Sequence, residues 1–311
     1  MAKPTKGQNV RVLTYDPTIE KFRCVAKSTS CTLTLNVNTD ESSTKDDIGM
    51  AKKPTGTSQS WQISVETLNV TDLPLMLRTI KAMEPFTLLF DEVSTTDNQT
   101  AIGATFARKG EAYMNDLSVN FNDREVASKS IQFQGSGELQ KLTSTPQVDV
   151  YEPDSDYERG QFTRLFIGSD NTATPAAVLA SAKNLTLHVS LSMESATTKD
   201  TTGFWEVQVP TELSFDISTS SLLKSGDTIT SSVEGKTFAD LEDIKDTMQP
   251  VRFEIAKVSG ANNRTKGAVI VEGSVLVTGL TSNNPNRQDS TWDATLAGYG
   301  IYNVPDDPAE S

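Results

Sequence analysis

Apolar and polar residues alternate along much of this chain with the period of two that is typical of half-buried β-strands. The clearest alternation lies in two stretches, Thr32–Gly49 and Thr186–Gly203, which align with each other without a gap. A slip of one residue would turn the apolar stripe to the other face of a strand. The stripe stays in phase, so the stretches are copies of one unit. Leu33, Leu35 and Val37 align with Leu187, Val189 and Leu191, and the residues identical in both copies are Thr32, Leu33, Thr44, Lys45, Asp46 and Gly49.

The pattern predicts a mainly β fold with one short helix in each half of the chain. Helical spacing replaces the alternation over Asp72–Met83 and Phe238–Thr247, with Asp72 and Thr237 as the expected N-caps. The strands expected in the first half are Asn9–Tyr15, Phe22–Ala26, Ser30–Asn38, Trp61–Thr67, Phe86–Val93, Ala101–Arg108, Tyr113–Phe121 and Ser130–Gly135. Those expected in the second half are Gln161–Ile167, Leu185–Ser192 and Leu213–Ser218.

The repeat extends over most of the chain. Ser60–Ser64 aligns with Ser214–Ser218 at the same separation as the two stretches above. The pair Gly135/Gly137 aligns with Gly298/Gly300 at a slightly larger separation, and there we expect a strand to end. The number of residues between aligned positions changes along the repeat while the strands are kept. We therefore expect the insertions that distinguish the copies to lie in loops. We therefore expect two tandem domains, residues 1–142 and 160–304, joined by a linker at 143–159 and followed by a tail at 305–311.

Two polar stretches, Thr39–Ser58 and Met193–Leu213, are expected to be long loops. Loops of more than about 12–15 residues in a compact domain are usually functional or disordered. Both contain the repeated Thr-Lys-Asp. A solvated turn, in which Lys and Asp balance each other, and a contact with a neighbouring subunit both account for it. The candidate contact residues are Glu41, Lys45, Asp46, Lys52, Lys53, Glu194, Lys199 and Asp200.

The composition narrows the class of protein. The 311 residues carry a net charge of −13, which disfavours a protein that grips DNA through its phosphates. The acidity provides solubility, or a surface that must not hold DNA, and both interpretations stay open. No apolar run is long enough for a transmembrane helix, and the start lacks the apolar core of a signal peptide. Cys24 and Cys31 are too few for a disulfide framework and are expected to be free thiols.

The sequence offers no constellation for catalysis. The one histidine, His188, lies on the polar side of its strand and has no second histidine to share a metal, so we interpret it as a surface or interface residue. Cys24 and Cys31 lack CxxC spacing and a basic activator. We expect no enzymatic activity, no cofactor and no metal.

Beyond these patterns, the chain resembles the major tail tube proteins of long-tailed bacteriophages, in particular the siphophage type. The resemblance depends on the order and spacing of several segments rather than on one motif. In the first copy these are KGQNVRVL, SCTLTLNV, ESSTKD, SQSWQISVETL and NDLSVNFNDREVASKSIQFQGSGEL. In the second copy they are RLFIG, ESATTKDTTGFW, TELSFDIS and the strand with Gly298 and Gly300. The duplication departs from the family, as does the longer turn at Ser282–Gln288.

The resemblance implies two tandem β-sandwich domains, each with one short helix, whose sheets join between subunits into a β-barrel channel. Six domains would form a ring, so this chain would form trimeric, pseudo-hexameric rings that stack into a tube. The partners implied are other copies of the chain, the tape-measure protein, the tail terminator and tail-tip proteins, without membrane insertion. DNA would pass through without specific binding during genome ejection. The location implied is the virion tail, with synthesis in the host cytoplasm.

Two alternatives remain at this point. One is a neck or distal-tail ring protein that is present in few copies per virion. The other is a tandem β-domain module that binds carbohydrate or acts as an adhesin. Exposed aromatic residues in a groove would favour the second, yet Trp61 and Trp292 lie within strand patterns.

Overall fold

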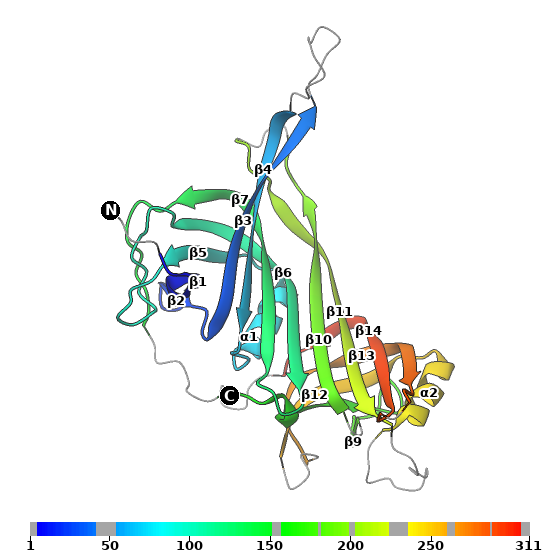
Figure 1. Ribbon diagram of the computed structural model, residues 1–311. Coiled ribbons are helices and arrows are strands. Elements are labelled where there is room, and N and C mark those ends of the chain that lie inside the picture. Colours follow the sequence, from blue (N-terminus) through cyan, green and yellow to red (C-terminus); the bar gives the residue numbers. More distant parts are fainter. Residues whose placement is uncertain are drawn as a thin grey trace.

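The computed structural model describes residues 5–41, 54–150, 157–179, 182–198, 203–223, 236–259, 265–286 and 288–305. The fold is mainly β, as predicted, with one helix in each half of the chain (Figure 1). The N-terminal half contains β1 (Val10–Asp16), β2 (Lys21–Cys24), β3 (Ser28–Glu41), β4 (Pro54–Thr67), α1 (Leu73–Ala82), β5 (Phe86–Glu92), β6 (Arg108–Asn122) and β7 (Ser128–Lys141). The C-terminal half contains β8 (Thr163–Ile167), β9 (Ala177–Val178), β10 (Ala182–Ser195), β11 (Gln208–Leu222), α2 (Phe238–Thr247), β12 (Val251–Ser259), β13 (Thr265–Asn283) and β14 (Thr291–Asn303).

The two halves have the same strand order. The N-terminal half is ordered β3-β4-β7-β6-β5-β1-β2, and the C-terminal half is ordered β10-β11-β14-β13-β12-β8-β9. Each helix follows the second strand of its order in the chain and ends at a methionine with left-handed backbone, Met83 (φ 56°) or Met248 (φ 51°). Every pairing between these strands is antiparallel.

The equivalence extends to register. Leu33 lies opposite Ile63 in β4, and Leu187 lies opposite Ile217 in β11. A register shift follows Asn38 in β3, and another follows the aligned residue Ser192 in β10. The shift at Met114/Asp116 in β6 recurs at Val277/Gly279 in β13, the positions that align with it when Gly135 is placed on Gly298. Bulges bend and twist a strand in a defined way, so their recurrence gives both halves the same local curvature.

The glycine pairs explain part of this repeat. A Cβ at Gly135 would lie 2.1 Å from the ring of Trp61, and a Cβ at Gly298 would lie 2.5 Å from the ring of Phe215. The second glycine of each pair has a positive φ, +79° at Gly137 and +76° at Gly300. The first glycine therefore admits an aromatic ring from the neighbouring strand, and the second adopts a conformation that other residues rarely take.

One continuous core links the two halves. A single cluster of buried apolar side chains includes Trp61 and Phe133 of the N-terminal half and Ile217 and Phe253 of the C-terminal half. α1 lies where the halves meet, because the hydroxyl of Tyr302 in β14 donates to the Leu77 carbonyl oxygen at 2.8 Å. Arg78 of the same helix donates to the Pro305 carbonyl oxygen at 2.7 Å.

Several predicted elements need correction. Ala101–Arg108 is not a strand, because only Ala101 forms an isolated bridge and β6 begins at Arg108. Thr39–Ser58 and Met193–Leu213 are not entirely loops, since β3, β4, β10 and β11 extend into them. Gly135 and Gly137 lie inside β7 rather than at its end. The polar ends of β3, β4, β10 and β11 form strand pairs that are exposed on both faces. They have no apolar stripe, so the sequence pattern predicts a loop there.

Candidate assembly interface

The two halves join edge to edge. β10 pairs with the second part of β6, from Asn184 opposite Asn122 to Ser190 opposite Asp116. The first part of β6 pairs with β5 instead, from Arg108 to Ala112. β6 therefore has β7 on one side and changes its partner on the other. We call the β6–β10 pairing the internal seam.

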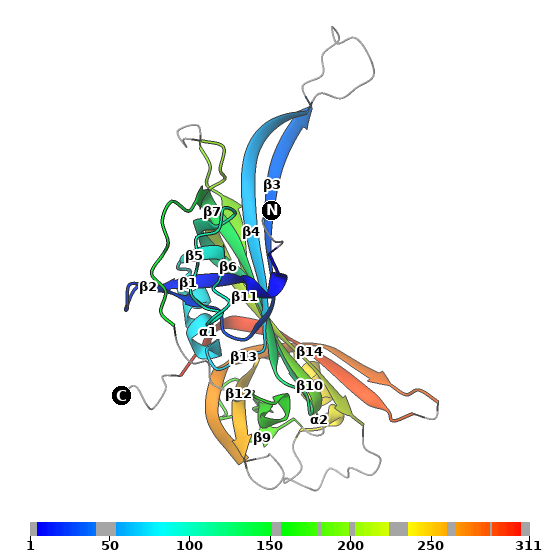
Figure 2. The same cartoon turned by 60° about the vertical axis from the view of Figure 1, so that its left-hand side comes forward.

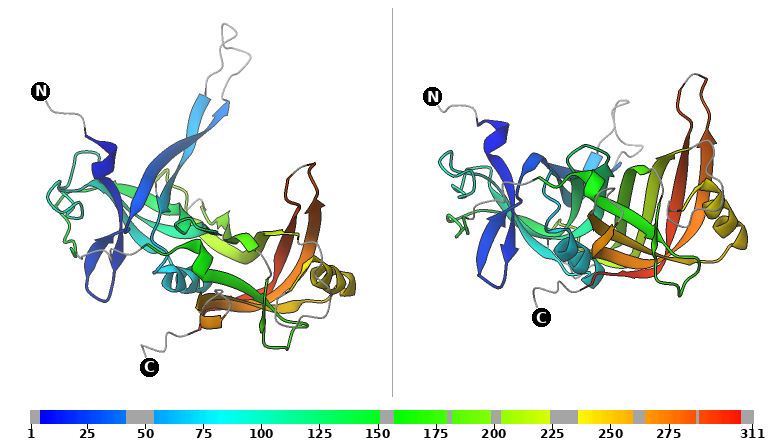
Figure 3. Two further views of the ribbon diagram at one scale, coloured as in Figure 1. Left: turned by 60° about the horizontal axis from the view of Figure 1, so that its bottom comes forward. Right: turned by 90° about the horizontal axis from the view of Figure 1, so that it is seen from below.

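The internal seam extends one sheet across the whole chain in the order β3-β4-β7-β6-β10-β11-β14-β13. Figure 3 shows the β3–β4 hairpin and the β13–β14 hairpin at the two ends of this row, with β10 and β11 between them. Figure 2 shows the β13–β14 hairpin standing away from the body of the molecule.

His188 fastens the internal seam on its polar face. Its Nδ1 lies 2.8 Å from Asp216 of β11, and its Nε2 lies 2.8 Å from Asp116 of β6. The three side chains are about one-third to one-half exposed. Partial burial opposes protonation of His188, but the hydrogen bonds that its ring makes to the two aspartates, together with their negative charge, outweigh it and raise the pKa of His188 above its usual value. The histidine therefore links a carboxylate of each half.

The two ends of this sheet have open edges in the part of the chain that the structure describes. β3 pairs only with β4, and the stretch of β13 after Val275 pairs only with β14. An unpaired edge presents backbone N–H and C=O groups that another strand can satisfy.

Two of the three residues in the apolar stripe of β3 are exposed, whereas the whole of its copy in β10 is buried. Leu35 is 56% exposed and Val37 is 58% exposed, but the equivalent Val189 and Leu191 are 0% and 4% exposed. The sequence pattern is the same in both strands, so the difference comes from the neighbours. Val189 lies opposite Leu117 of β6 at the internal seam, whereas Leu35 has no strand on that side within the described residues.

The face of this sheet opposite the core is polar and acidic. The outward positions of the paired segments carry Glu66, Asp116, Glu212, Asp216 and Asp293, and the exposed Lys109 lies on the same side at the start of β6. The rest of the face is mostly Ser, Thr, Asn and Gln. Carboxylates therefore outnumber positive groups on this surface, which disfavours binding of phosphate groups.

Most of the predicted contact residues lie outside the described residues, namely Lys45, Asp46, Lys52, Lys53, Lys199 and Asp200. Glu41 is exposed at the end of β3, and Glu194 is exposed near the end of β10. Figure 1 shows both strands reaching well above the rest of the sheet. Glu41 and Glu194 thus do not form a site with other described residues. Both lie near the far ends of projecting hairpins.

Residues after β10 form a second contact between the halves. Phe204 accepts a hydrogen bond from the Gln59 backbone at 2.6 Å, and Glu206 accepts bonds from Ser58 at 2.6 Å and Asn38 at 2.7 Å. The segment of the C-terminal half that contains Phe204 and Glu206 therefore lies along β4. The sequence alone did not single out Glu206, because a lone glutamate in a polar stretch carries no signal.

The remaining reactive groups have structural surroundings. Burial raises the pKa of Cys24 to about 12, and it also raises the pKa of Cys31. A neutral thiol is a poor nucleophile. Within the described residues, no group of three His, Cys, Asp or Glu side chains is placed to hold a metal ion. Likewise, none of the helices described has the length and apolarity to span a membrane.

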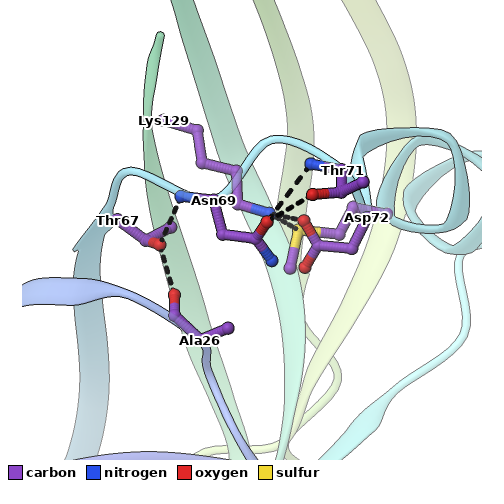
Figure 4. Close-up of polar contacts among 7 residues, drawn as sticks. Ala26, Thr67, Asn69, Thr71, Asp72 and Lys129 are labelled. Atoms are coloured by element: carbon purple, nitrogen blue, oxygen red, sulfur yellow. Dashed lines mark hydrogen bonds and ion pairs between the residues drawn. The ribbon is translucent and has the colours of Figure 1, made fainter. Parts of the chain in front are cut away.

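Lys129 is a buried charged residue that the sequence analysis did not identify. Its ammonium group, fully buried, binds the Asp72 carboxylate and contacts Met76 Sδ at 3.2 Å (Figure 4). Asp72 occupies the N-cap position of α1 as predicted, but its side chain makes no capping bond because it binds Lys129. Burial lowers the pKa of Lys129, and Asp72 opposes that effect. Two hydrogen bonds stabilise the turn before α1. The Asn69 side chain accepts one from the Thr71 hydroxyl, and the Thr67 hydroxyl donates the other to the Ala26 carbonyl oxygen.

Comparison with known proteins gives a distant likeness only. No protein-family model matches the chain, and no curated protein matches it. A solved structure described as the tail of an empty gene transfer agent (GTA) particle with C6 symmetry is similar over 48% of this chain and 99% of its own, with 12% identity and a TM-score of 0.37. A second, the virion of a native gene transfer agent particle, covers the same shares with 12% identity and a TM-score of 0.36. At this distance, the function has to be argued from the chain itself.

Proposed function

We propose that this protein is a structural subunit of a virion tail tube and has no enzymatic activity. Copies of the chain assemble into rings, and stacked rings form a hollow channel through which DNA passes into the host. The observation that carries the proposal is the contrast between β10 and β3. One apolar strand is buried at a seam inside the chain, and its copy is exposed at an open edge.

Each copy would satisfy the open edges of its neighbours. β3 and the end of β13 lie at opposite ends of one sheet, so a copy that adds to one edge leaves its own other edge open. Such head-to-tail contacts close into a ring when the rotation between copies permits. With two tandem domains, residues 1–142 and 160–304, three chains supply the six domains of the tail-tube ring implied by the family resemblance. The ring is then a pseudo-hexameric homotrimer.

The acidic face of the sheet supports a channel for DNA. A closed ring of these sheets has two faces, of which the apolar one is occupied by the core. The other face carries carboxylates and neutral polar groups. If it lines the channel, repulsion from phosphates lets DNA slide without specific binding.

The predicted contact loops fit the same scheme. In the gap-free alignment of the two copies, the counterpart of Lys52 is Glu206 and the counterpart of Ser58 is Glu212. Glu206 binds Ser58 within the chain. The equivalent contact between chains would pair Lys52 of one copy with Glu212 of the next, and opposite charges suit an intersubunit contact. Glu41, Lys45, Asp46, Lys53, Glu194, Lys199 and Asp200 would contact the next chain or the next ring.

The test is the mass of the purified protein in solution, followed by negative-stain microscopy of the same sample. We expect trimers, or tubes of stacked rings with a hollow centre. Some tube subunits await a nucleus, so tail-tip and tape-measure proteins are added to a sample that stays monomeric. A chain that forms no ring or tube even then contradicts the proposal. Charge reversal at Lys52→Glu is expected to weaken assembly, and adding Glu212→Lys is expected to restore it.

The copy number per particle separates this proposal from a neck or distal-tail ring. A tube subunit is present in many copies, whereas those rings contain few. Binding of the purified protein to glycans would instead favour a carbohydrate-binding or adhesin module.

A further inference from the structure

We infer that the contact between neighbouring chains is a seam of defined register, in which β3 of one copy adds to β13 of the next. This inference rests on the proposed function, because it names the surfaces by which the copies assemble. Its basis is the internal seam, where the strand equivalent to β3 already pairs with the strand equivalent to β13. We call the predicted pairing the external seam.

The equivalences fix which residues are opposite each other. β10 corresponds to β3, and β6 corresponds to β13, with the same bulges in each pair. His188 opposite Ser118 therefore becomes Thr34 opposite Thr281. Val189 opposite Leu117 becomes Leu35 opposite Leu280, and the external seam runs over residues 30–36 of β3 and 279–285 of the β13 hairpin.

Exposure agrees with this assignment. Thr34 and Leu35 are exposed on β3, and Thr281 is exposed on β13. Leu280 is half-buried and packs against the core cluster. Pairing places Leu280 beside Leu35, the residue whose counterpart Val189 is 0% exposed. The external seam thus covers the apolar side chain that the single chain leaves open.

The external seam differs from the internal seam in strength. The clamp of His188, Asp116 and Asp216 has the counterparts Thr34, Gly279 and Gln62, which carry no charge. The buried pair Leu187 and Val119 has the counterparts Leu33 and Ser282. Main-chain hydrogen bonds therefore supply more of the external contact. We therefore expect the seam between chains to be the more easily reversed of the two.

Disulfide trapping tests the register. In a parent in which Cys24 and Cys31 are replaced by serine, Thr34→Cys is combined with Thr281→Cys. Residues directly opposite in an antiparallel pair are within reach of a disulfide. Under oxidation we expect a ladder of covalent species that ends at three chains. The matched control combines Thr34→Cys with Asn283→Cys on the same face, two residues out of register. Diagonal neighbours lie about 7–8 Å apart, so we expect roughly tenfold less covalent product from the control.

Mixing single variants tests the direction of the contact. Chains with Thr34→Cys mixed with chains with Thr281→Cys are expected to give covalent dimers, while each variant alone gives none. Dimers from Thr34→Cys alone would mean that two β3 edges pair with each other, and would overturn the inference. A higher yield from the out-of-register control would overturn the register.

Two further measurements keep the outcomes separate. If the serine parent fails to fold, the same pair is placed in the native background, and the disulfide is located by mass spectrometry of peptides. The mass of the uncrosslinked assembly is measured in parallel. Rings or tubes without a disulfide between residues 34 and 281 overturn the register but leave the proposed function standing. A chain that stays single under every condition, with tail-tip partners present, overturns both.

Discussion

β3 and β10 are two copies of one strand in two different situations. Both alternate in the same phase, and both pair with the following strand in the same register. Val189 of β10 is buried completely, yet Leu35 of β3 is 56% exposed. The two residues have the same place in their strands, but only Val189 has a second strand beside it, with Leu117 of β6 directly opposite. The repeat thus identifies an edge of β3 that the single chain leaves unpaired, and this edge is where we propose that the next copy binds.

The halves also differ at the base of the helix. Lys129 lies opposite Thr67, and its counterpart Trp292 lies opposite Ser221. Lys129 binds Asp72, whereas the ring of Trp292 packs edge-on against Phe238 with 6.2 Å between centroids. One half fills this buried position with an ion pair and the other fills it with an aromatic pair. The same backbone position can therefore hold either a lysine or a tryptophan, because each side chain has a partner in its own half.

The largest expected effect comes from introducing an aspartate at one position of the apolar stripe, in β10 or in its copy β3. Val189→Asp buries a charge without a partner, so we expect a loss of more than about 4 kcal/mol, enough to prevent folding. Leu35→Asp faces water in the single chain and is expected to change its stability by less than about 0.5 kcal/mol. It is expected to abolish assembly, because the charge would enter the seam. Urea unfolding and mass in solution check both variants, and assembly of Leu35→Asp at the level of the unmodified protein would break the comparison.

The next largest effect is expected at the ion pair. Asp72→Asn leaves the ammonium of Lys129 buried without a counter-charge, which costs about 3 kcal/mol or more. Replacing the pair together, with Asp72→Asn and Lys129→Met, imitates the apolar solution of the C-terminal half and is expected to recover most of that loss. Denaturant unfolding measures both variants. If the single variant is as stable as the unmodified protein, the pair has no structural role.

A smaller effect is expected at the glycines that admit aromatic rings. Gly135→Ala forces the ring of Trp61 to move, and Gly298→Ala does the same to Phe215. Overpacking of this kind costs about 1–3 kcal/mol. We expect the larger loss at Gly298, because its Cβ would also lie 2.6 Å from the Phe215 carbonyl oxygen, which cannot move aside as a ring can. Gly7→Ala is the control, since its Cβ would meet nothing within 4 Å. A tolerated alanine at one site only would show that the halves pack differently there.

The sequence predicted much of this architecture because each strand of the repeat is indicated by two aligned segments. Two copies at one separation indicated the strands of β3 and β10, and helical spacing located α2 with both of its ends. The ends of the long hairpins were missed, since strands exposed on both faces lack an apolar stripe. The ion pair of Lys129 was also missed, because a lysine at an inward position carries no sign of the carboxylate that meets it.

The candidate interface was predictable only in part. His188 was expected at a surface or interface, and the structure places it at the internal seam. Its partners Asp116 and Asp216 come from strands that lie 72 and 28 residues away in the chain, and no local pattern connects them. The open edge of β13 required the strand order, which emerges only when the sheet is assembled.

The smallest effect concerns pH and separates the two seams. The two aspartates raise the pKa of His188 in the folded chain, so its protonated form stabilises the fold. That contribution is complete below the unfolded pKa of about 6.5 and is lost as the pH rises through the higher folded value. The side chains are partly exposed, which limits the contribution to about 1 kcal/mol or less. Unfolding of the protein and of His188→Gln, measured from slightly acidic to alkaline pH, is expected to show a difference only on the acidic side of that window.

The external seam should not share this pH dependence. Its counterparts of the clamp, Thr34, Gly279 and Gln62, do not titrate. We therefore expect His188→Gln to lower the stability of the single chain at the acidic end of this pH range, while the tendency of the chains to assemble changes little at either end. Sedimentation at the two ends of the range checks this expectation. A parallel loss of assembly in His188→Gln would mean that the internal seam transmits its state to the edges, and the two seams would then have to be treated as one coupled contact.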